Sequence, residues 1–421
     1  MVWSACDGRG GVGPGVLTRI ADAVGTPVWV YDAAHIRERY AALNAALAAV
    51  PHRLHYAVKA NSNLAILRLL RTCGAGADIV SIGELERVMA AGFAPVDVIF
   101  SGVGKTPTEI EQALRAGVQV INVESESELR QVGRIAQDVG LRARVGLRVN
   151  PDVVADTHPY TQTGEKGVKF GIPWDEVEHL ARLIVAHEAM TLVSLGVHLG
   201  SQIAEARPYA EGAKRLEDLI GAVRQAGAGA LRHVDVGGGL AISYGQGEEL
   251  SAEAFADVAV PLAERTGLEL IVEPGRWLVG NAGALLTRVL YRKRAGGREL
   301  AIVDAGMNDL IRPSLYHAEH PIRVVGAGSQ TDAADPVDVV GPICETGDFL
   351  GYGRSLGSVP EGALLAVEGA GAYGFSMSSN YNSRPRGAEV LLDGDRWGLI
   401  RARESLNDLW HGETVEPVWH E

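Results

Sequence analysis

The sequence is poor in cysteine, with only Cys6, Cys73 and Cys344 among 421 residues. An odd and widely separated set gives no disulfide framework, so we expect a protein of the reducing cytoplasm. Long apolar runs are also missing, and no window approaches the ~20 residues that a membrane helix needs. The first ten residues, MVWSACDGRG, lack a basic segment followed by an apolar one, which predicts no secretion signal.

The sequence has few positive charges, with 39 Lys and Arg against 52 Asp and Glu, which gives a formal net charge of -13. This balance argues against a nucleic acid held on a basic face. Apolar residues make up 47% of the chain and charged residues 22%, as in globular proteins with an ample core. Glycine is abundant at 52 residues, well above the average share of ~7%, so many tight turns are expected.

Eight short β-branched runs alternate with amphipathic segments from about residue 50 onward. Segments 63–73, 108–117 and 252–267 have the apolar spacing of helices. Eight such alternations predict a closed (β/α)8 barrel of parallel strands. An open doubly wound sheet is the alternative, but it needs a Gly-rich dinucleotide turn where this chain has KANSN. The expected strands are 54–58, 78–81, 97–100, 119–123, 143–149, 193–198, 231–236 and 268–273.

The pattern changes after about residue 280, where helical periodicity fades. Short apolar runs separated by Gly, Pro and Asp take over, which predicts an antiparallel β domain of the barrel or sandwich type. The early run VWVY at 28–31 is expected to pair into this same domain. The length also favours two domains. We therefore predict a barrel over residues 35–280 and a β domain built from residues 1–34 and 281–421.

Barrels of this type carry their chemistry at the carboxyl ends of the strands. Polar residues and glycines follow the expected strands at several of these ends. Taken singly, such residues are commonly solvated side chains or plain turns, so their shared position is the signal. The residues are Lys59, Asp78, Arg148, Asn150, His198, Gly237, Gly238, Gly239, Glu273, Gly275 and Arg276.

Lys59 ends an apolar strand in YAVKAN. A partly desolvated lysine amine can form a Schiff base, because burial lowers its pKa and frees its lone pair. Pyridoxal phosphate requires such a lysine, a phosphate cradle and an ionic partner for its ring nitrogen. The glycine triplet 237–239 offers backbone N–H groups to an anion, and Glu273 is a candidate partner for the nitrogen. His198 is a candidate to lie flat against the ring.

Eleven segments, spread over nearly the whole chain, match the motifs of a known enzyme family in the same order. They are YAVKANSN (56–63), GADIVSIGELERV (76–88), RVNPDV (148–153), THPYTQTG (157–164), KFGI (169–172), HLGSQ (198–202), DVGGGL (235–240), EPGRWLV (273–279), DAGMNDLIRPSLYHAEH (304–320), VGPICETGDFL (340–350) and GAYGFSMSSNYNSRPR (371–386). The chain resembles the diaminopimelate decarboxylases, a family of pyridoxal-phosphate enzymes with an alanine-racemase-like barrel (fold type III).

The resemblance implies decarboxylation of meso-2,6-diaminopimelate to L-lysine and CO2, the last step of lysine biosynthesis, with pyridoxal phosphate as the cofactor and no metal. Lys59 would hold the cofactor covalently, His198 would stack on its ring and Glu273 would face the ring nitrogen. The other residues implied in cofactor binding are Asp78, Ser201, Gly238, Gly239, Gly275, Arg276 and Tyr373, the last also near the substrate.

The resemblance also assigns substrate-binding residues. Arg276, Arg312 and Tyr316 would bind the far carboxylate, which suits the two-pronged hydrogen bonding of guanidinium groups. Glu345 would bind the distal amine, and Cys344 would protonate the carbanion after CO2 leaves. The segment bearing these last two residues would reach the site of a neighbouring subunit, so a homodimer with shared active sites is implied. No nucleic-acid or membrane partner is expected.

Several alternatives remain open at this point. A related decarboxylase acting on another amino acid, or on one tethered to a carrier protein, is one, because Thr346 and Glu319 depart from the family pattern. An ornithine or arginine decarboxylase is disfavoured because Arg312 would repel a cationic tail. A non-catalytic cofactor-binding regulator would be expected to lack Lys59 or Cys344, and both are present. A racemase would need a second base on the opposite face, and none is identified.

Overall fold

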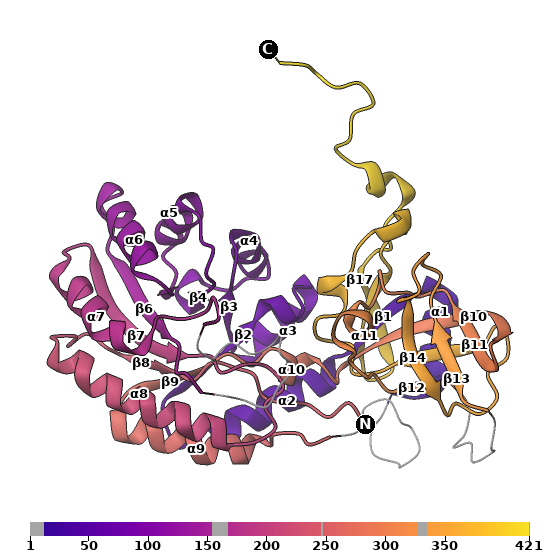
Figure 1. The fold of residues 1–421 in the computed structure, drawn as a ribbon, viewed down its shortest axis with the longest axis horizontal. Coiled ribbons are helices and arrows are strands. Elements are labelled where there is room, and N and C mark those ends of the chain that lie inside the picture. The colour runs from indigo at the N-terminus through magenta and orange to yellow at the C-terminus, as the bar shows by residue number, and fades with distance from the viewer. Residues whose placement is uncertain (1–11, 154–166, 246, 327–334, 421) are drawn as a thin grey trace. The chain divides into compact units, whose positions relative to one another are not determined.

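The computed structural model describes residues 12–153, 167–245, 247–326 and 335–420. The chain divides into two compact units, one of residues 34–280 and one of residues 1–33 with 281–421. Figure 1 traces the order of the elements along the chain. Cys6 and the segment 157–164 lie outside the described residues. No helix within the described ranges is long and apolar enough to cross a membrane.

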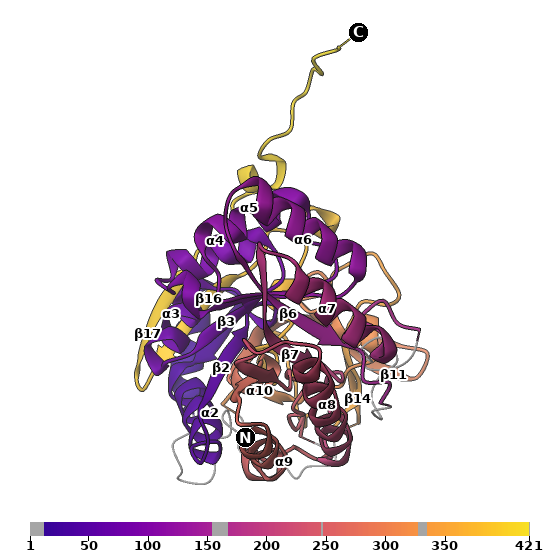
Figure 2. The ribbon, with the colours of Figure 1, turned by 90° about the vertical axis from the view of Figure 1, so that its left-hand side faces the viewer.

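The unit of residues 34–280 is a closed barrel of parallel strands in the order β2-β3-β4-β5-β6-β7-β8-β9. Figure 2 shows helices around this ring of strands. All eight expected strands lie in the barrel, so the predicted (β/α)8 fold is confirmed. The strands are β2 (His52–Ala57), β3 (Gly76–Ile79), β4 (Val98–Phe100), β5 (Val120–Val123), β6 (Ala143–Val149), β7 (Met190–Val197), β8 (His233–Asp235) and β9 (Glu269–Val272).

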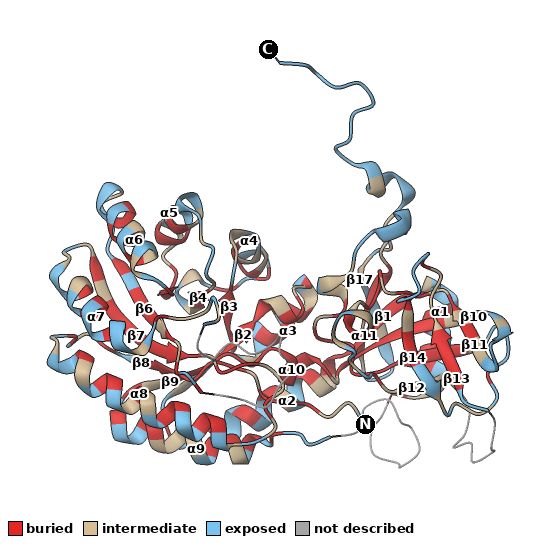
Figure 3. Cartoon of the chain, viewed as in Figure 1, coloured by how far each residue is buried: buried red, intermediate tan, exposed pale blue. Residues whose placement is uncertain are grey.

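The helices of this unit bury one face and expose the other, as the banded colouring in Figure 3 shows. In α3 the buried side chains are Ile66, Leu67, Leu69 and Leu70, and the helix ends at Gly74 with a left-handed φ of 103°. Helix starts carry side-chain caps, as in α3, α4, α5, α6 and α9. The helices are α2 (Ala33–Ala46), α3 (Leu64–Cys73), α4 (Ile82–Ala90), α5 (Pro107–Ala116), α6 (Glu126–Asp138), α7 (Val177–Ala186), α8 (Arg207–Gln225), α9 (Ala252–Thr266) and α10 (Arg276–Val279).

The second unit contains a nine-stranded sheet with the main order β14-β13-β11-β10-β1-β16-β17, to which β12 and β15 are joined. The early strand β1 pairs with β10 and β16, which confirms its expected place in this domain. The strands are β1 (Val28–Asp32), β10 (Gly283–Ala295), β11 (Arg298–Val303), β12 (Ile322–Val324), β13 (Val337–Val340), β14 (Phe349–Arg354), β15 (Leu364–Val367), β16 (Ala388–Asp393) and β17 (Arg396–Arg401).

This sheet is mixed, whereas the sequence pattern predicted an antiparallel one. Six of its strand pairings are antiparallel. The pairs β1·β16 and β11·β13 are parallel. Parallel neighbours need a long crossover between them, and here the crossovers are long stretches of chain that include other elements. Apolar alternation does not distinguish the two directions, so the sequence could not reveal these pairs.

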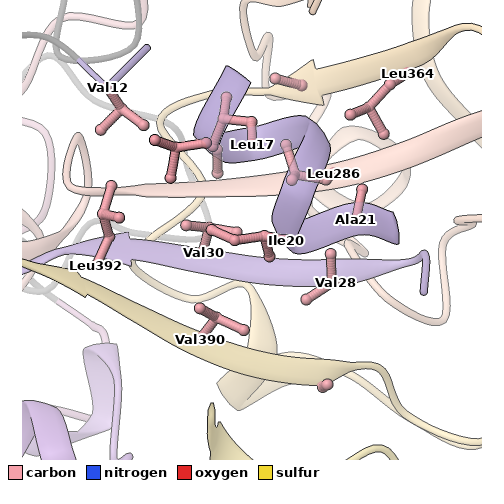
Figure 4. Close-up of a cluster of buried hydrophobic side chains, with 14 residues drawn as sticks. Val12, Leu17, Ile20, Ala21, Val28, Val30, Leu286, Leu364, Val390 and Leu392 are labelled. Carbon is pink, nitrogen blue, oxygen red and sulfur yellow. The ribbon is translucent and has the colours of Figure 1, made fainter. Parts of the chain in front are cut away.

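The core of the second unit joins the two ends of the chain. Helix α1 (Pro14–Val24) buries Leu17 and Ile20 completely. These side chains belong to one cluster with Val28 and Val30 of β1 and with residues of β10, β15 and β16 (Figure 4). Each fully buried aliphatic side chain of this size stabilises the fold by roughly 1.5–3 kcal/mol. Residues from the first and last parts of the chain therefore stabilise one unit together.

Candidate active site

Lys59 lies in the short turn Val58–Ala60 that follows β2, beside the end of β3. Its Nζ is 3.7 Å from Oδ2 of Asp78, whose side chain is 1% exposed. Neither carboxylate oxygen of Asp78 has a hydrogen-bond partner within the described ranges. A buried carboxylate needs a nearby positive charge, so Asp78 holds the Lys59 ammonium at this rim of the barrel.

His198 follows β7 and Glu273 follows β9, and the barrel brings them together. His198 Nδ1 is 3.9 Å from Oε2 of Glu273. The backbone N–H of Gly238 donates to His198 Nδ1 at 3.2 Å, so the neutral ring carries its proton on Nε2. Burial, helped by the positive charges of Arg148 and Lys59, lowers the pKa of His198 well below its usual value. The imidazole is therefore neutral, which suits a ring that lies against an aromatic cofactor.

Three buried carboxylates converge near Lys59. Burial raises the pKa of Glu273 well above its usual value, and the charges of Asp235 and Asp78 raise it further. Burial likewise raises the pKa of Asp235 to about 7. Such a cluster favours an added cation, because a positive charge would relieve the repulsion among the carboxylates. A protonated pyridine nitrogen is a group of this kind, so the residues present fit pyridoxal phosphate.

The glycine triplet after β8 runs directly against neighbouring backbone. A Cβ at Gly238 would lie 2.1 Å from the carbonyl oxygen of Glu273. A Cβ at Gly239, where φ is +94°, would lie 2.3 Å from the carbonyl oxygen of Gly200. Only glycine fits both positions. Gly275 is similarly tight, with a Cβ position 3.1 Å from the Cβ of Ala57. A glycine loop of this kind can present its N–H groups to a phosphate.

Arg276 is buried and is held by two hydroxyl groups. Its Nη1 donates to the Tyr244 hydroxyl at 2.7 Å, and its Nη2 donates to Ser201 Oγ at 3.0 Å. Both partners are neutral hydroxyl groups, and together they orient the guanidinium. Ser201 therefore contacts Arg276 directly, and Tyr244, which the sequence analysis did not single out, completes the arrangement.

In the second unit, Arg312 begins the short helix α11 (Arg312–Tyr316) and is 5% exposed. Its Nη1 lies 3.0 Å from Nε2 of His320, whose Nδ1 lies 2.9 Å from the carbonyl oxygen of Glu368. A carbonyl only accepts, so Nδ1 carries the proton and Nε2 accepts from the guanidinium. His320 is thus neutral and fixes the direction of Arg312. This role of His320 was not predicted, although His320 belongs to the same segment, 304–320, as Arg312.

Cys344 and Glu345 lie at the exposed tip of the loop between β13 and β14. The base of this loop is fixed by the buried Asp348, which accepts the backbone N–H groups of Met307 and Ile343, both at 2.6 Å. The Ser314 hydroxyl of α11 donates to the carbonyl oxygen of Gly347 at 2.6 Å. The helix that carries Arg312 and Tyr316 is therefore joined to the loop that carries Cys344 and Glu345.

The structure distributes the candidate residues over its two units. The barrel unit brings Lys59, Asp78, His198, Ser201, Gly238, Gly239, Glu273, Gly275 and Arg276 to the carboxyl ends of its strands. The second unit carries Arg312, Tyr316, Cys344, Glu345 and Tyr373, the last in the left-handed region with φ 57°.

Two acidic neighbours of the strand-end residues, Glu124 and Glu84, were not predicted from the sequence. Arg148, at the end of β6, pairs with the buried Glu124 at 3.2 Å and acts electrostatically on His198. Burial raises the pKa of Glu84, close to Asp78 and Lys59, to about 7. Arg148 was predicted to lie at the rim because it is near the carboxyl end of a strand. No feature of the sequence predicted that its partner is Glu124.

Residues 33–280 match the family described as pyridoxal-dependent decarboxylase, pyridoxal binding domain. The fold and the site thus define a pyridoxal-phosphate-dependent decarboxylase, and the expected cofactor and enzyme class are confirmed. Diaminopimelate decarboxylases of Pseudomonas aeruginosa and Vibrio cholerae are 48% and 45% identical over 95% of this chain, and the matches span 96% and 95% of those proteins. The chain belongs to the diaminopimelate decarboxylase family.

The solved structures agree with this assignment. The crystal structure of diaminopimelate decarboxylase from Helicobacter pylori complexed with L-lysine superimposes with a TM-score of 0.90 at 40% identity. The match covers 94% of this chain and 98% of that one. The whole (β/α)8 barrel and the β domain are therefore shared with the relative.

Proposed function

We propose that this chain decarboxylates meso-2,6-diaminopimelate to L-lysine and CO2. The observation that carries the proposal is the rim of the barrel, where Lys59, a neutral His198 and three buried carboxylates gather. Its relatives at 42–48% identity are named diaminopimelate decarboxylases, and the structural relative from Helicobacter pylori was solved with L-lysine. This reaction is the last step of lysine biosynthesis.

The barrel unit would hold the cofactor. Bound pyridoxal phosphate supplies an electron sink for the electrons left when CO2 departs. Glu273 would hold a proton on the ring nitrogen, because its carboxylate is buried among others that also favour a cation. His198 would lie on the ring, and Lys59 would hold the cofactor covalently through its amine. The triplet 237–239 and the backbone of Gly275 and Arg276 would bind the phosphate, with Ser201 and Tyr373 nearby, and Asp78 would lie beside Lys59.

The second unit would hold the substrate. Arg312, oriented by His320, and Tyr316 would bind the distal carboxylate together with Arg276. The Glu345 carboxylate would bind the distal ammonium. The thiol of Cys344 would deliver its proton to Cα from one face, so that a proton takes the place of the departing CO2.

The active unit would be a homodimer with shared active sites in the cytoplasm. Cys344 and Glu345 lie on an exposed loop whose base is fixed, which is a suitable form for a segment that enters a neighbouring subunit. Cys73 and Cys344 are both free cysteines within the described residues.

The test is CO2 release from purified protein with cofactor, incubated separately with meso-diaminopimelate, lysine, ornithine, arginine and glutamate. We expect release from the first substrate alone. Release from another substrate and none from the first would overturn the proposal.

A second measurement tests the cofactor linkage. Borohydride trapping and peptide mapping should find the adduct on Lys59, and Lys59→Ala should lose both the adduct and turnover. The matched control is Lys214→Ala, which changes an exposed lysine on the outer helix α8 and should keep both.

A further inference from the structure

Two neighbouring side chains contact the tip of the loop that bears Cys344 and Glu345. The Tyr381 hydroxyl donates a hydrogen bond to Oε1 of Glu345. The backbone N–H of Cys344 donates to Oδ1 of Asn382 at 3.0 Å. The neighbouring residues Tyr381 and Asn382 thus each make one hydrogen bond to the neighbouring residues Glu345 and Cys344. We call the segment 379–384, which contains Tyr381 and Asn382, the holding segment.

These bonds add to two backbone bonds within the tip, in which the Glu345 N–H donates to the Ile343 carbonyl oxygen at 2.8 Å and the Asp348 N–H donates to the Glu345 carbonyl oxygen at 3.1 Å. Cys344, Glu345 and Asn382 are exposed, and Tyr381 is 44% exposed. Because the side chains at the tip itself are exposed, its geometry is held by hydrogen bonds rather than by packing. Among the described residues, the second carboxylate oxygen of Glu345, Oε2, accepts no hydrogen bond. The phenol therefore orients the carboxylate and leaves one oxygen for a ligand.

The backbone of the holding segment is strained, which indicates that its geometry is maintained for a reason. Asn382 and Ser383 have φ values of 56° and 53°, two successive left-handed residues without a glycine. Left-handed backbone is costly for residues with a Cβ, although asparagine tolerates it best. This conformation places the Asn382 amide beside the Cys344 N–H.

The base of the holding segment is firmly attached to the same unit. Asn380 Nδ2 donates to Oε2 of Glu404 at 2.6 Å, and Arg384 Nη2 donates to the carbonyl oxygen of Asp304 at 3.1 Å. The backbone N–H of Ser379 donates to the carbonyl oxygen of Asn308 at 2.8 Å. Tyr381 and Asn382 are thus presented from a fixed base.

We propose that Tyr381 and Asn382 are positioning residues, Tyr381 for the carboxylate that reads the distal amine of the substrate and Asn382 for the thiol that donates the proton. The inference rests on the proposed function, because it assigns Tyr381 to specificity through Glu345 and Asn382 to catalysis through Cys344. Glu345 raises the pKa of Tyr381, so the phenol stays protonated and keeps donating.

Tyr381→Phe removes one hydroxyl and tests the first role. We expect KM for meso-diaminopimelate to rise about fivefold, as for loss of an exposed hydrogen bond to a charged group, with kcat within about twofold. The inhibition constant of 2-aminopimelate, which lacks the distal amine, should not change. Tyr352→Phe is the matched control, since Tyr352 is 45% exposed on the same unit and should leave both constants unchanged. An equal loss of affinity for both ligands would overturn the role.

A double-mutant cycle separates this inference from the proposed function. Glu345→Gln should raise KM for meso-diaminopimelate, and adding Tyr381→Phe to it should have no further effect. Additive effects would overturn the role of Tyr381 while leaving that of Glu345 intact. An unchanged KM in Glu345→Gln would instead refute the assignment of Glu345 in the proposed function, and the inference with it.

Asn382→Gly tests the second role, because glycine keeps the left-handed backbone and removes only the acceptor. We expect kcat to fall about tenfold with little change in KM, since the thiol loses its position but the substrate contacts remain. Ser383→Gly, the control, removes strain at the next residue without touching the acceptor and should keep kcat. An unchanged kcat in Asn382→Gly would overturn the role.

Discussion

At the scale of single residues, burial of acidic groups sets the pH dependence of stability. Asp309 is 2% exposed and accepts the backbone N–H of Gly306 at 3.1 Å. Burial raises its pKa to about 7 from an ordinary value near 4. The folded state therefore binds a proton that the unfolded state releases, so stability is full below about pH 4 and falls as pH rises through about 7.

We predict that Asp309→Asn removes this pH dependence, because an amide keeps the acceptor oxygen and cannot ionise. The variant should gain stability over the wild type at pH 8, by up to about 4 kcal/mol, and much less at pH 5. Urea unfolding of both proteins at the two pH values measures the difference. Equal differences at pH 5 and pH 8 would contradict the pKa shift.

Glu273 is the second residue for which replacing a carboxylate by an amide is informative. Glu273→Gln removes the negative charge but keeps the size of the side chain, so the proton on the ring nitrogen would lose its partner. We predict a fall in kcat of about 100-fold with the Lys59 adduct still formed. Borohydride trapping and initial rates on the same sample measure both. Wild-type kcat would show that Glu273 does not act on the cofactor.

At the scale of elements, the buried Lys105 joins three segments of the barrel. Its ammonium donates to the carbonyl oxygens of Gly102 and Asn122, both at 2.6 Å, and to Oε1 of Glu128 at 2.8 Å. All three of its hydrogens are used, and the side chain is 0% exposed. The loop after β4, the end of β5 and the start of α6 thus depend on one cation.

Replacing Lys105 with Met leaves the Glu128 carboxylate buried without its partner. We predict a loss of about 3–5 kcal/mol in the free energy of unfolding, measured by urea denaturation. The double variant Lys105→Met with Glu128→Leu removes the uncompensated charge and should recover part of the loss. A double variant less stable than Lys105→Met would indicate that Glu128 stabilises the fold independently of Lys105.

The barrel could be predicted from the sequence because each of its strands carries its own local signal. The eight apolar runs are short, bounded and separated by helical patterns, and strand ends bearing Lys59, His198 and Glu273 identified the rim. The partners of these residues could not be predicted in the same way. Arg148 meets Glu124 only because β5 and β6 are neighbours, and His320 meets Arg312 only through a local turn. The first contact depends on strand pairing and the second on the path of a turn, and neither is encoded in the apolar pattern.

At the scale of the whole molecule, the proposed sharing of active sites between two subunits makes a strong prediction. Lys59→Ala and Cys344→Ala homodimers should each be inactive. When the two are mixed and allowed to exchange subunits, about half of the dimers are hybrids with one intact site, so activity should return to about one quarter of wild type. Steady-state rates before and after mixing measure this. No recovery, with exchange confirmed by mass, would refute the sharing of residues between subunits.

The position of β1 has a consequence for the order of folding. Val28 pairs with Leu286 on one side and Ala388 on the other, so neither neighbour exists when the ribosome has just released the first thirty residues. The intervening stretch 34–280 can complete its own ring of strands while the leading strand is still without partners. On the nascent chain, β1 is therefore among the last strands of its unit to gain partners, and its apolar side chains stay available to chaperones until then.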